Sequence, residues 1–186
     1  TRSYFSPNEL KSLFSLFSKA IVQSSNGILL SNFINNRELS FITDGFLLNF
    51  QFLDSSNNPI WVLNDKSLIT IINFWATWCG PCKAEIPVLE RIFLKYHNVG
   101  VEMVSISMDK DTSIWIKELI NLNLPWTQLI FPKEESEKWI QRLNVYLIPS
   151  TIVLGKDHKI LQQYYGFDSL TENKLDSLIK KNAVHK

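Results

Sequence analysis

The sequence predicts an α/β fold in which helices flank a central mixed β-sheet, with an N-terminal hairpin and an extra N-terminal helix. Strand-like apolar runs alternate with segments of helical periodicity, which is typical of the α/β class. Leu68–Trp75 is a nearly continuous apolar run with β-branched residues, which indicates a strand buried on both faces. Thr151–Leu154 and Ile160–Gly166 flank a short turn at the end of the chain. This closing hairpin predicts that some strands run antiparallel.

The composition is that of an ordinary globular protein and excludes several classes of partner. The 186 residues are 45% apolar and 20% charged, which suits one compact domain with a substantial core. Lysine and arginine number 19 against 18 acidic residues, so the basic excess expected of a nucleic-acid-binding protein is missing. The uncharged stretches Ala20–Asn36 and Ser67–Cys82 are interrupted by polar residues, glycine or proline and do not predict a membrane span.

The first forty residues are predicted to form a helical extension, and residues 41–186 the main domain. Ser6–Glu9 carries the pattern of a capping box with Pro7 in the first turn. Apolar residues then repeat at helical spacing as far as Ile21, and Ser24–Gly27 ends the pattern. An isolated helix of this length is marginal in water, so we expect its apolar face to dock, most simply on its own domain.

The first strands of the main domain are predicted to form a hairpin. Phe46–Leu53 has strand character, Asp54–Pro59 is rich in turn residues, and Ile60–Leu63 returns as the partner strand. Leu68–Trp75 follows and leads into a helix that extends to about His97. Pro87 within that helix predicts a kink.

The rest of the chain continues the alternation and ends in a helix that opens at Ser169 with Glu172 three residues on. The intervening segments are predicted as a strand at Val101–Ser107, a helix at Thr112–Leu122, a strand near Trp126–Phe131, a helix near Glu134–Leu143 and the two closing strands. The inward residues of the helix at 112–122 are expected to be Ile114, Trp115, Leu119 and Leu122.

The two cysteines of the chain, Cys79 and Cys82, form one Cys-x-x-Cys unit. A disulfide between them would close a very small loop, so the spacing suits chemistry better than structural crosslinking. The buried strand ends just before Cys79, which places this residue at a helix N-terminus, where unpaired N–H groups and the helix dipole stabilise a thiolate. Cys82 lies almost one turn further on, inside the helix. We therefore predict that Cys79 is the exposed nucleophile and that Cys82 resolves the mixed disulfide.

Two other interpretations of the motif are weaker. Cys-x-x-Cys is also half of a zinc site, but the further ligands would have to come from His97, His158 or His185, which lack paired spacing. We therefore predict no metal. A peroxiredoxin would carry threonine three residues before its reactive cysteine, and this chain has Ala76 there.

The segment Asn73–Pro87 resembles the active site of the thioredoxin superfamily, and in particular its TlpA/ResA-type extracytoplasmic branch. The resemblance extends more loosely from about Phe41 to Ile179. It implies a thioredoxin-like fold with a cis Ile148–Pro149 peptide bond packed against the two sulfur atoms. The backbone of Ile148 would pair with an extended substrate, and Trp78 would offer it an exposed apolar surface.

The resemblance also makes Glu85 a candidate proton handler for Cys82, although a solvated carboxylate in the first turns of a helix is an equally good interpretation. Many cytosolic thioredoxins have an aspartate where this chain has Asn73. Asparagine cannot accept a proton at working pH, so the general base must be Glu85, water or the substrate.

The implied function is that of a thiol-disulfide oxidoreductase that reduces or exchanges disulfides in other proteins. The Gly80-Pro81 pair resembles that of reducing thioredoxins, and the dithiol itself carries the electrons, so no cofactor is predicted. By the same resemblance we expect an extracytoplasmic location, in the bacterial periplasm or on the outer face of a membrane, a membrane-embedded dithiol as electron donor, and a membrane tether outside this chain. Apocytochrome c maturation is one role known in the branch. The alternative is a redox-inactive binding module whose interaction element is the helix between Ser6 and Gly27.

Overall fold

Seven strands form the central sheet in the order β4-β3-β7-β6-β5-β8-β9, and the computed structural model describes residues 12–24, 27, 31, 42–43, 45–132 and 136–183. The strands of this sheet are β3 (Gln51–Leu53), β4 (Pro59–Trp61), β5 (Ile69–Trp75), β6 (Val101–Ser107), β7 (Thr127–Ile130), β8 (Ser150–Leu154) and β9 (Ile160–Tyr165). β5, β6 and β7 run parallel, whereas β3, β4, β8 and β9 pair with their neighbours antiparallel. The predicted mixed α/β sheet is confirmed.

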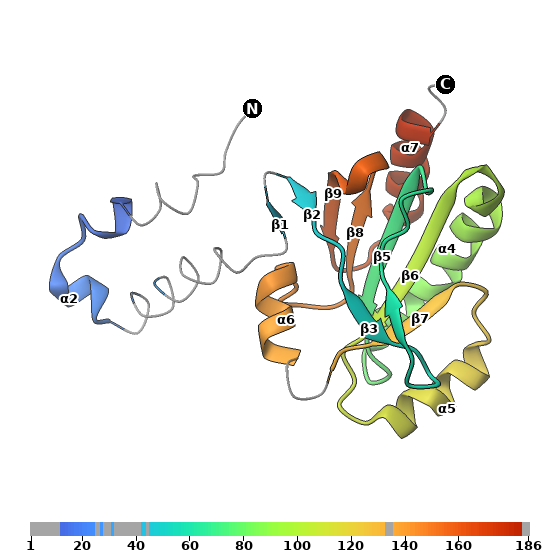
Figure 1. Cartoon of the computed structure of the whole chain (residues 1–186), viewed down its shortest axis with the longest axis horizontal. Helices are drawn as coiled ribbons and strands as arrows, with labels where there is room; N and C mark the ends of the chain where they lie inside the picture. The colour runs from blue at the N-terminus through green and yellow to red at the C-terminus, as the bar shows by residue number, and fades with distance from the viewer. Residues whose placement is uncertain are drawn as a thin grey trace.

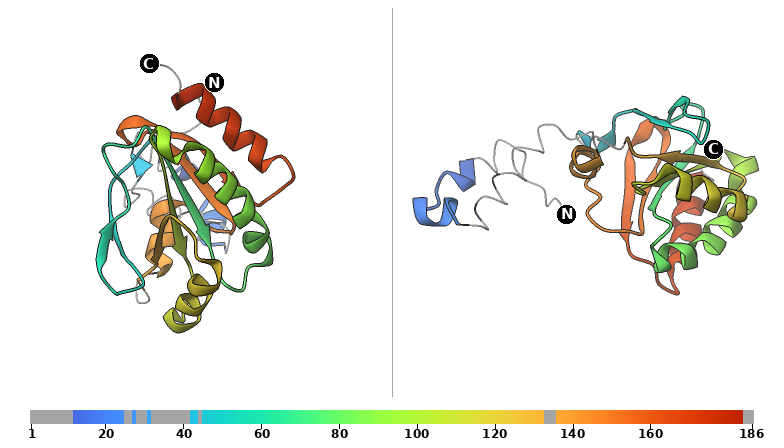
Figure 2. Two further views of the ribbon diagram at one scale, coloured as in Figure 1. Left: turned by 90° about the vertical axis from the view of Figure 1, so that its right-hand side faces the viewer. Right: turned by 90° about the horizontal axis from the view of Figure 1, so that it is seen from below.

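Helices cover both faces of this sheet (Figures 1 and 2). α4 (Gly80–Tyr96) and α7 (Thr171–Ala183) lie side by side on one face, and α6 (Ser136–Leu143) packs on the other. α5 (Thr112–Leu122) contributes Trp115 to the cluster that holds the two cysteines. Short 3-10 turns follow α4 at His97–Val99 and precede β9 at Lys156–His158. Among the described helices, none has both the length and the apolarity required to cross a membrane.

The alternation of side chains along β5 divides the core into two layers. Ile72 and Phe74 face the cluster that contains the α6 residues, whereas Ile69, Ile71 and Trp75 face α4 and its neighbours. Every residue of β5 is buried, as its continuous apolar run predicts. Because β5 is an interior strand between β6 and β8, its carboxyl end has a strand on each side, and the cysteines follow directly after it.

The predicted strand at 46–53 is divided into two strands that pair with different partners. β2 (Phe46–Leu47) pairs with β1 (Ile42–Thr43), and β3 forms the predicted hairpin with β4. The Asn49 side chain lies between β2 and β3, where its Oδ1 accepts the N–H groups of Phe50 and Leu63 at 2.9 Å and its Nδ2 donates to Leu63. A side chain that takes over backbone hydrogen bonds in this way interrupts a strand ladder.

The predicted continuous N-terminal helix is wrong within the described residues. Residues 12–14 are helical, but Ser18 has an extended backbone with ψ of 153°, and α2 spans only Lys19–Val22. Serine hydroxyls bond to main-chain carbonyls here, as Ser15 does to Ser12 at 2.7 Å, and this competes with helix formation. The predicted start at Ser6 lies outside the described residues.

Four large apolar side chains of this segment are also exposed, whereas Phe14 and Val22 are half-buried, so the expected docking of the whole apolar face is not found among the described residues. The exposed side chains are Leu13, Leu16, Phe17 and Ile21.

Two helices differ in detail from the prediction. Ile114 of α5 is 52% exposed, and Ile116 packs inward in its place beside Trp115. Asp111 caps this helix by accepting the N–H groups of Ser113 and Ile114, and the helix therefore begins at Thr112. The last helix begins at Thr171 rather than Ser169. α4 continues through Pro87 as one helix.

Candidate redox site

The two cysteines lie where β5 gives way to α4 and are joined by a disulfide bond. Cys79 is the N-cap residue of α4, and its Sγ accepts the N–H of Cys82 at 3.2 Å. Pro81 occupies the first turn of the helix, where its missing N–H costs no hydrogen bond. The helix N-terminus therefore points at the Cys79 sulfur, as the sequence predicts.

Cys79 is more accessible than Cys82, as predicted, but the difference is small because both residues are buried. Cys82 is 1% exposed and Cys79 is 6% exposed, so the expectation of an exposed Cys79 is wrong for this disulfide form. The cysteines belong to a cluster with Trp75, Ile86 and Trp115, which covers most of the sulfur surface. A partner can therefore reach only a small area of Cys79.

The loop before β8 packs against the cluster that contains the disulfide. The Ile148–Pro149 peptide bond is cis, Pro149 is buried, and Ile148 packs against the cluster that contains both cysteines. The Pro149 carbonyl accepts the N–H of Gly166 at 2.7 Å, which ties this loop to the end of β9. Trp78 precedes Cys79 and is 70% exposed. Trp78 and Ile148 are 70 residues apart in the sequence. The fold nevertheless places both next to the residues of the disulfide, as the resemblance implies.

Glu85 is buried, so its interpretation as a solvated carboxylate is wrong. It follows Cys82 by three residues on α4 and is 1% exposed. Asn73 donates to Glu85 Oε2 at 3.0 Å, and the Thr151 hydroxyl donates to Oε1 at 3.5 Å. Burial raises the pKa of Glu85 to about 7, although both hydrogen bonds act to lower it. A carboxyl group with this pKa exchanges its proton near neutral pH.

Asp109 and Thr151 lie in the site but were not predicted from the sequence. Asp109 accepts hydrogen bonds from both the backbone and the hydroxyl of Thr77, two residues before Cys79. Thr151 reaches Glu85 because it pairs with Asn73 in the β5–β8 register. Position gives a usable signal for Asp109, since it follows the carboxyl end of a strand, where the sites of open α/β sheets gather.

The charged residue next to the motif has its own partner. Lys83 forms an ion pair of 2.7 Å with Glu118 of α5, and its side chain is 43% exposed. This agrees with its prediction as a surface residue.

Over the part of the chain that the structure describes, no three histidine, cysteine, aspartate or glutamate side chains gather where they could hold a metal ion.

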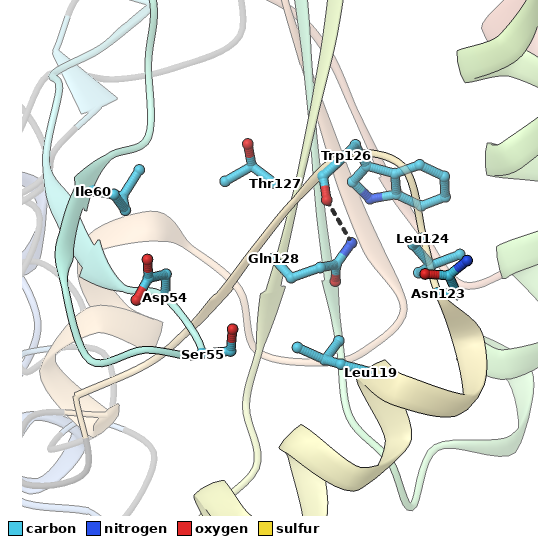
Figure 3. Close-up of a pocket in the computed structure, with 9 residues that line it drawn as sticks. All are labelled: Asp54, Ser55, Ile60, Leu119, Asn123, Leu124, Trp126, Thr127 and Gln128. Carbon is cyan, nitrogen blue, oxygen red and sulfur yellow. Dashed lines mark hydrogen bonds between the residues drawn. The ribbon is translucent and has the colours of Figure 1, made fainter.

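A separate cavity of about 450 Å³ opens between the β3–β4 turn and α5 (Figure 3). Its lining includes Asp54, Leu119 and Gln128, and the Gln128 amide donates to the Trp126 carbonyl at 3.3 Å. None of the predicted site residues lines this cavity. This cavity is therefore separate from the Cys79–Cys82 disulfide.

A disulfide at the N-terminus of the first helix after a central parallel strand, facing a cis-proline loop, defines a thiol-disulfide oxidoreductase with a thioredoxin-like fold. Comparison with known proteins agrees. Residues 68–160 match a family described as thioredoxin-like. The thiol-disulfide oxidoreductase ResA of Bacillus thuringiensis is 30% identical over 135 residues, which cover 72% of this chain and 74% of that protein. The chain belongs to the thioredoxin-like family.

Solved structures share the fold. A thiol:disulfide interchange protein from a Bacteroides species superposes with a TM-score of 0.65 at 18% identity, over 77% of this chain and 91% of the other. StoA from Bacillus subtilis superposes with a TM-score of 0.57 at 18% identity, over 70% of this chain and 95% of the other. The predicted fold and the predicted class of enzyme are both confirmed.

Proposed function

We propose that this oxidoreductase reduces or exchanges disulfides in proteins outside the cytoplasm, with Cys79 as nucleophile and Cys82 as resolving thiol. The Cys79 thiolate attacks one sulfur of the substrate disulfide, and the other leaves as a thiolate that takes up a proton. Cys82 then loses its proton and attacks Cys79, which releases the second substrate thiolate and closes the Cys79–Cys82 disulfide. The observation that carries this proposal is the position of Cys79 as N-cap of α4, with the Cys82 N–H directed at its sulfur.

Glu85 is the proton acceptor for Cys82 in this proposal. It lies one turn further along α4, with a pKa of about 7 that burial maintains. Asn73 cannot take this role because an amide does not accept a proton at this pH, but it orients the carboxylate by donating to it at 3.0 Å. The proton of Cys82 thus moves to a buried group on the same face of the helix.

Trp78, Ile148 and Pro149 form the substrate-binding surface in this proposal. Trp78 is a large exposed aromatic next to the nucleophile, and Ile148 contacts the cysteine cluster. An extended substrate segment would pair with the Ile148 backbone, which gives affinity without demanding one sequence.

The direction of electron flow is proposed to be reductive. Gly80 and Pro81 between the cysteines resemble the pair of reducing thioredoxins. The extracytoplasmic setting, the membrane-embedded dithiol donor and a tether outside this chain follow from resemblance to the TlpA/ResA branch.

Two measurements test this function. The reduction potential of the Cys79–Cys82 couple, measured against glutathione, is expected near about −270 mV; a value near about −120 mV would contradict the reductive direction. In an insulin-reduction assay Cys79→Ser should abolish turnover, whereas Cys82→Ser should accumulate a mixed disulfide between Cys79 and the substrate. Substrate binding that persists in both variants, with no disulfide turnover by the unaltered protein, would favour a binding module.

A further inference from the structure

The loop of residues 76–79, which joins β5 to α4, is hydrogen-bonded through Thr77 to Asp109, which follows the neighbouring strand β6. β5 and β6 are parallel neighbours, and Trp75 at the end of β5 stands opposite Ser107 at the end of β6. Two residues beyond these ends lie Thr77 and Asp109. The register of the two strands therefore brings an acidic side chain beside the loop that leads to Cys79.

Asp109 uses both carboxylate oxygens on this loop and its own strand end. Its Oδ2 accepts the Thr77 N–H at 2.9 Å and the Ser107 hydroxyl at 2.7 Å, and its Oδ1 accepts the Thr77 hydroxyl at 2.7 Å. The Asp109 N–H donates in turn to the Ser107 hydroxyl at 3.0 Å. Asp109 is only 8% exposed, so these hydrogen bonds are largely shielded from water.

Residues 76–79 form a short turn that a main-chain hydrogen bond closes. The Cys79 N–H donates to the Ala76 carbonyl at 3.0 Å, and the Trp75 carbonyl accepts the Met108 N–H at 2.8 Å. A displacement of Thr77 would therefore move Trp78 and Cys79 with it. Only the main chain of Trp78 separates the clamped residue from the sulfur-bearing one.

We propose that Asp109 is a positioning residue for disulfide exchange, which acts by clamping Thr77 so that Cys79 stays seated at the N-terminus of α4. The inference rests on the proposed role of Cys79 as nucleophile. Loss of the clamp moves the sulfur away from the helix N-terminus and weakens the stabilisation of its thiolate. Loss of the clamp also frees Trp78 from its fixed place beside the nucleophile.

Substitutions of Asp109 and Thr77, which together form the clamp, distinguish the effect of the hydrogen bonds from the effect of the carboxylate charge. Asp109→Ala removes all three accepted hydrogen bonds, and Asp109 borders a cavity of about 290 Å³, so this change does not leave a sealed void. Asp109→Asn keeps the shape, because the amide oxygen accepts from the Thr77 N–H while its NH₂ donates to the Thr77 hydroxyl. Thr77→Val loses one of the two Thr77 bonds. Asp111→Ala is the matched control, since the Asp111 side chain caps α5 by accepting the N–H groups of Ser113 and Ile114.

The test measures the alkylation rate of Cys79 by iodoacetamide against pH, in reduced protein with Cys82→Ser in every variant. Asp109→Ala should raise the measured pKa of Cys79 by about one unit, which slows alkylation at pH below that pKa about tenfold. Thr77→Val should shift it in the same direction by less. Asp109→Asn and Asp111→Ala should leave it near that of the parent. With Cys82 restored, Asp109→Ala should also raise the KM for insulin.

An unchanged pH profile for Asp109→Ala, with only a lower melting temperature, would overturn the proposal by reducing Asp109 to a structural residue. If Asp109→Ala does not fold, Thr77→Val decides, and an unchanged profile in that variant overturns the proposal equally. The proposed function fails separately, since that failure would appear as insulin reduction by Cys79→Ser, whatever the Asp109 variants do.

Discussion

Glu85 places a carboxyl group in the core, where its side chain is 1% exposed. It lies among apolar side chains of α4 and β5, and its two hydrogen-bond donors, Asn73 and Thr151, are both neutral. Neutral donors only partly replace the water that an ionised carboxylate loses on burial, so ionisation in the folded state costs free energy. This is the physical reason for its raised pKa.

Stability should therefore fall with rising pH through this one group. The pKa of Glu85 is about 7 in the folded chain and 4.5 as a free side chain, so the folded state binds the proton more tightly and loses stability between these values. The loss amounts to roughly 3 kcal/mol above pH 7. Glu85→Gln should remove it, with a higher free energy of unfolding than the parent at pH 8 and a similar one at pH 5. Urea unfolding of the oxidised protein at both pH values measures this. Equal differences between parent and variant at the two values would contradict it.

Trp78 should affect substrate binding rather than chemistry. Its side chain is 70% exposed, so replacement by alanine removes a contact surface without opening the core. Trp78→Ala should raise the KM for insulin several-fold, consistent with about 1 kcal/mol for one aromatic contact, while the reduction of a small disulfide reagent stays unchanged. Trp61→Ala is the control, because Trp61 is also exposed but lies on β4 at the edge of the sheet. A similar loss with both disulfide substrates would show that Trp78 supports the loop instead.

At the scale of elements, α7 attaches to the sheet and to α4 through a buried apolar row with ion pairs at its rim. Leu175 and Ile179 are fully buried against the cluster on β5 and α4. Arg91 of α4 binds Glu172 with two nitrogens, and this pair is largely exposed. Exposed ion pairs contribute little, so the apolar row dominates the attachment of α7.

Leu175→Ala should lower the free energy of unfolding by about 2–5 kcal/mol, because it removes a buried side chain and leaves a cavity between helix and sheet. Ser177→Ala, an exposed change on the same helix, should alter it by less than about 0.5 kcal/mol. Denaturant titration of both variants measures the difference. A loss for Leu175→Ala no larger than that of Ser177→Ala would mean that α7 is not part of the cooperative core.

For the whole molecule, the sequence predicted helices and strands best where a periodic pattern of apolar residues has clear ends. β6 and α5 begin and end at the predicted residues because their apolar patterns meet clear boundaries in glycine and in the capping Asp111. The positions of Cys79 and Cys82 at the start of a helix followed from the Cys-x-x-Cys spacing together with the buried strand that precedes it. The signals failed where one side chain overrides a pattern, as Asn49 does between β2 and β3 and as the serines do after residue 14.

The parts of the site that depend on strand register could not be predicted from spacing. Thr151 meets Glu85 because β8 pairs antiparallel with β5 in one register out of several that the apolar pattern allows. Asp109 meets Thr77 for the same reason in the β5–β6 pair. The burial of Glu85 is likewise a tertiary property, since its position on the helix allows either a solvated or a covered carboxylate.

The proposed division of the chain at residue 40 leads to a prediction for the molecule as a whole. The buried apolar clusters of the described residues begin at Leu47, and no residue of α2 is buried. Removing residues 1–40 keeps β1, whose pairing with β2 begins at Ile42, and costs little burial among the described residues. The shortened chain should melt within about 2 °C of the full chain, since a loss of 1 kcal/mol would lower the melting temperature by about 2–4 °C in a domain of this size. It should also reduce insulin at the same rate. Circular dichroism melting and the insulin assay measure the two quantities, and a much lower melting temperature would place residues 1–40 in the cooperative domain.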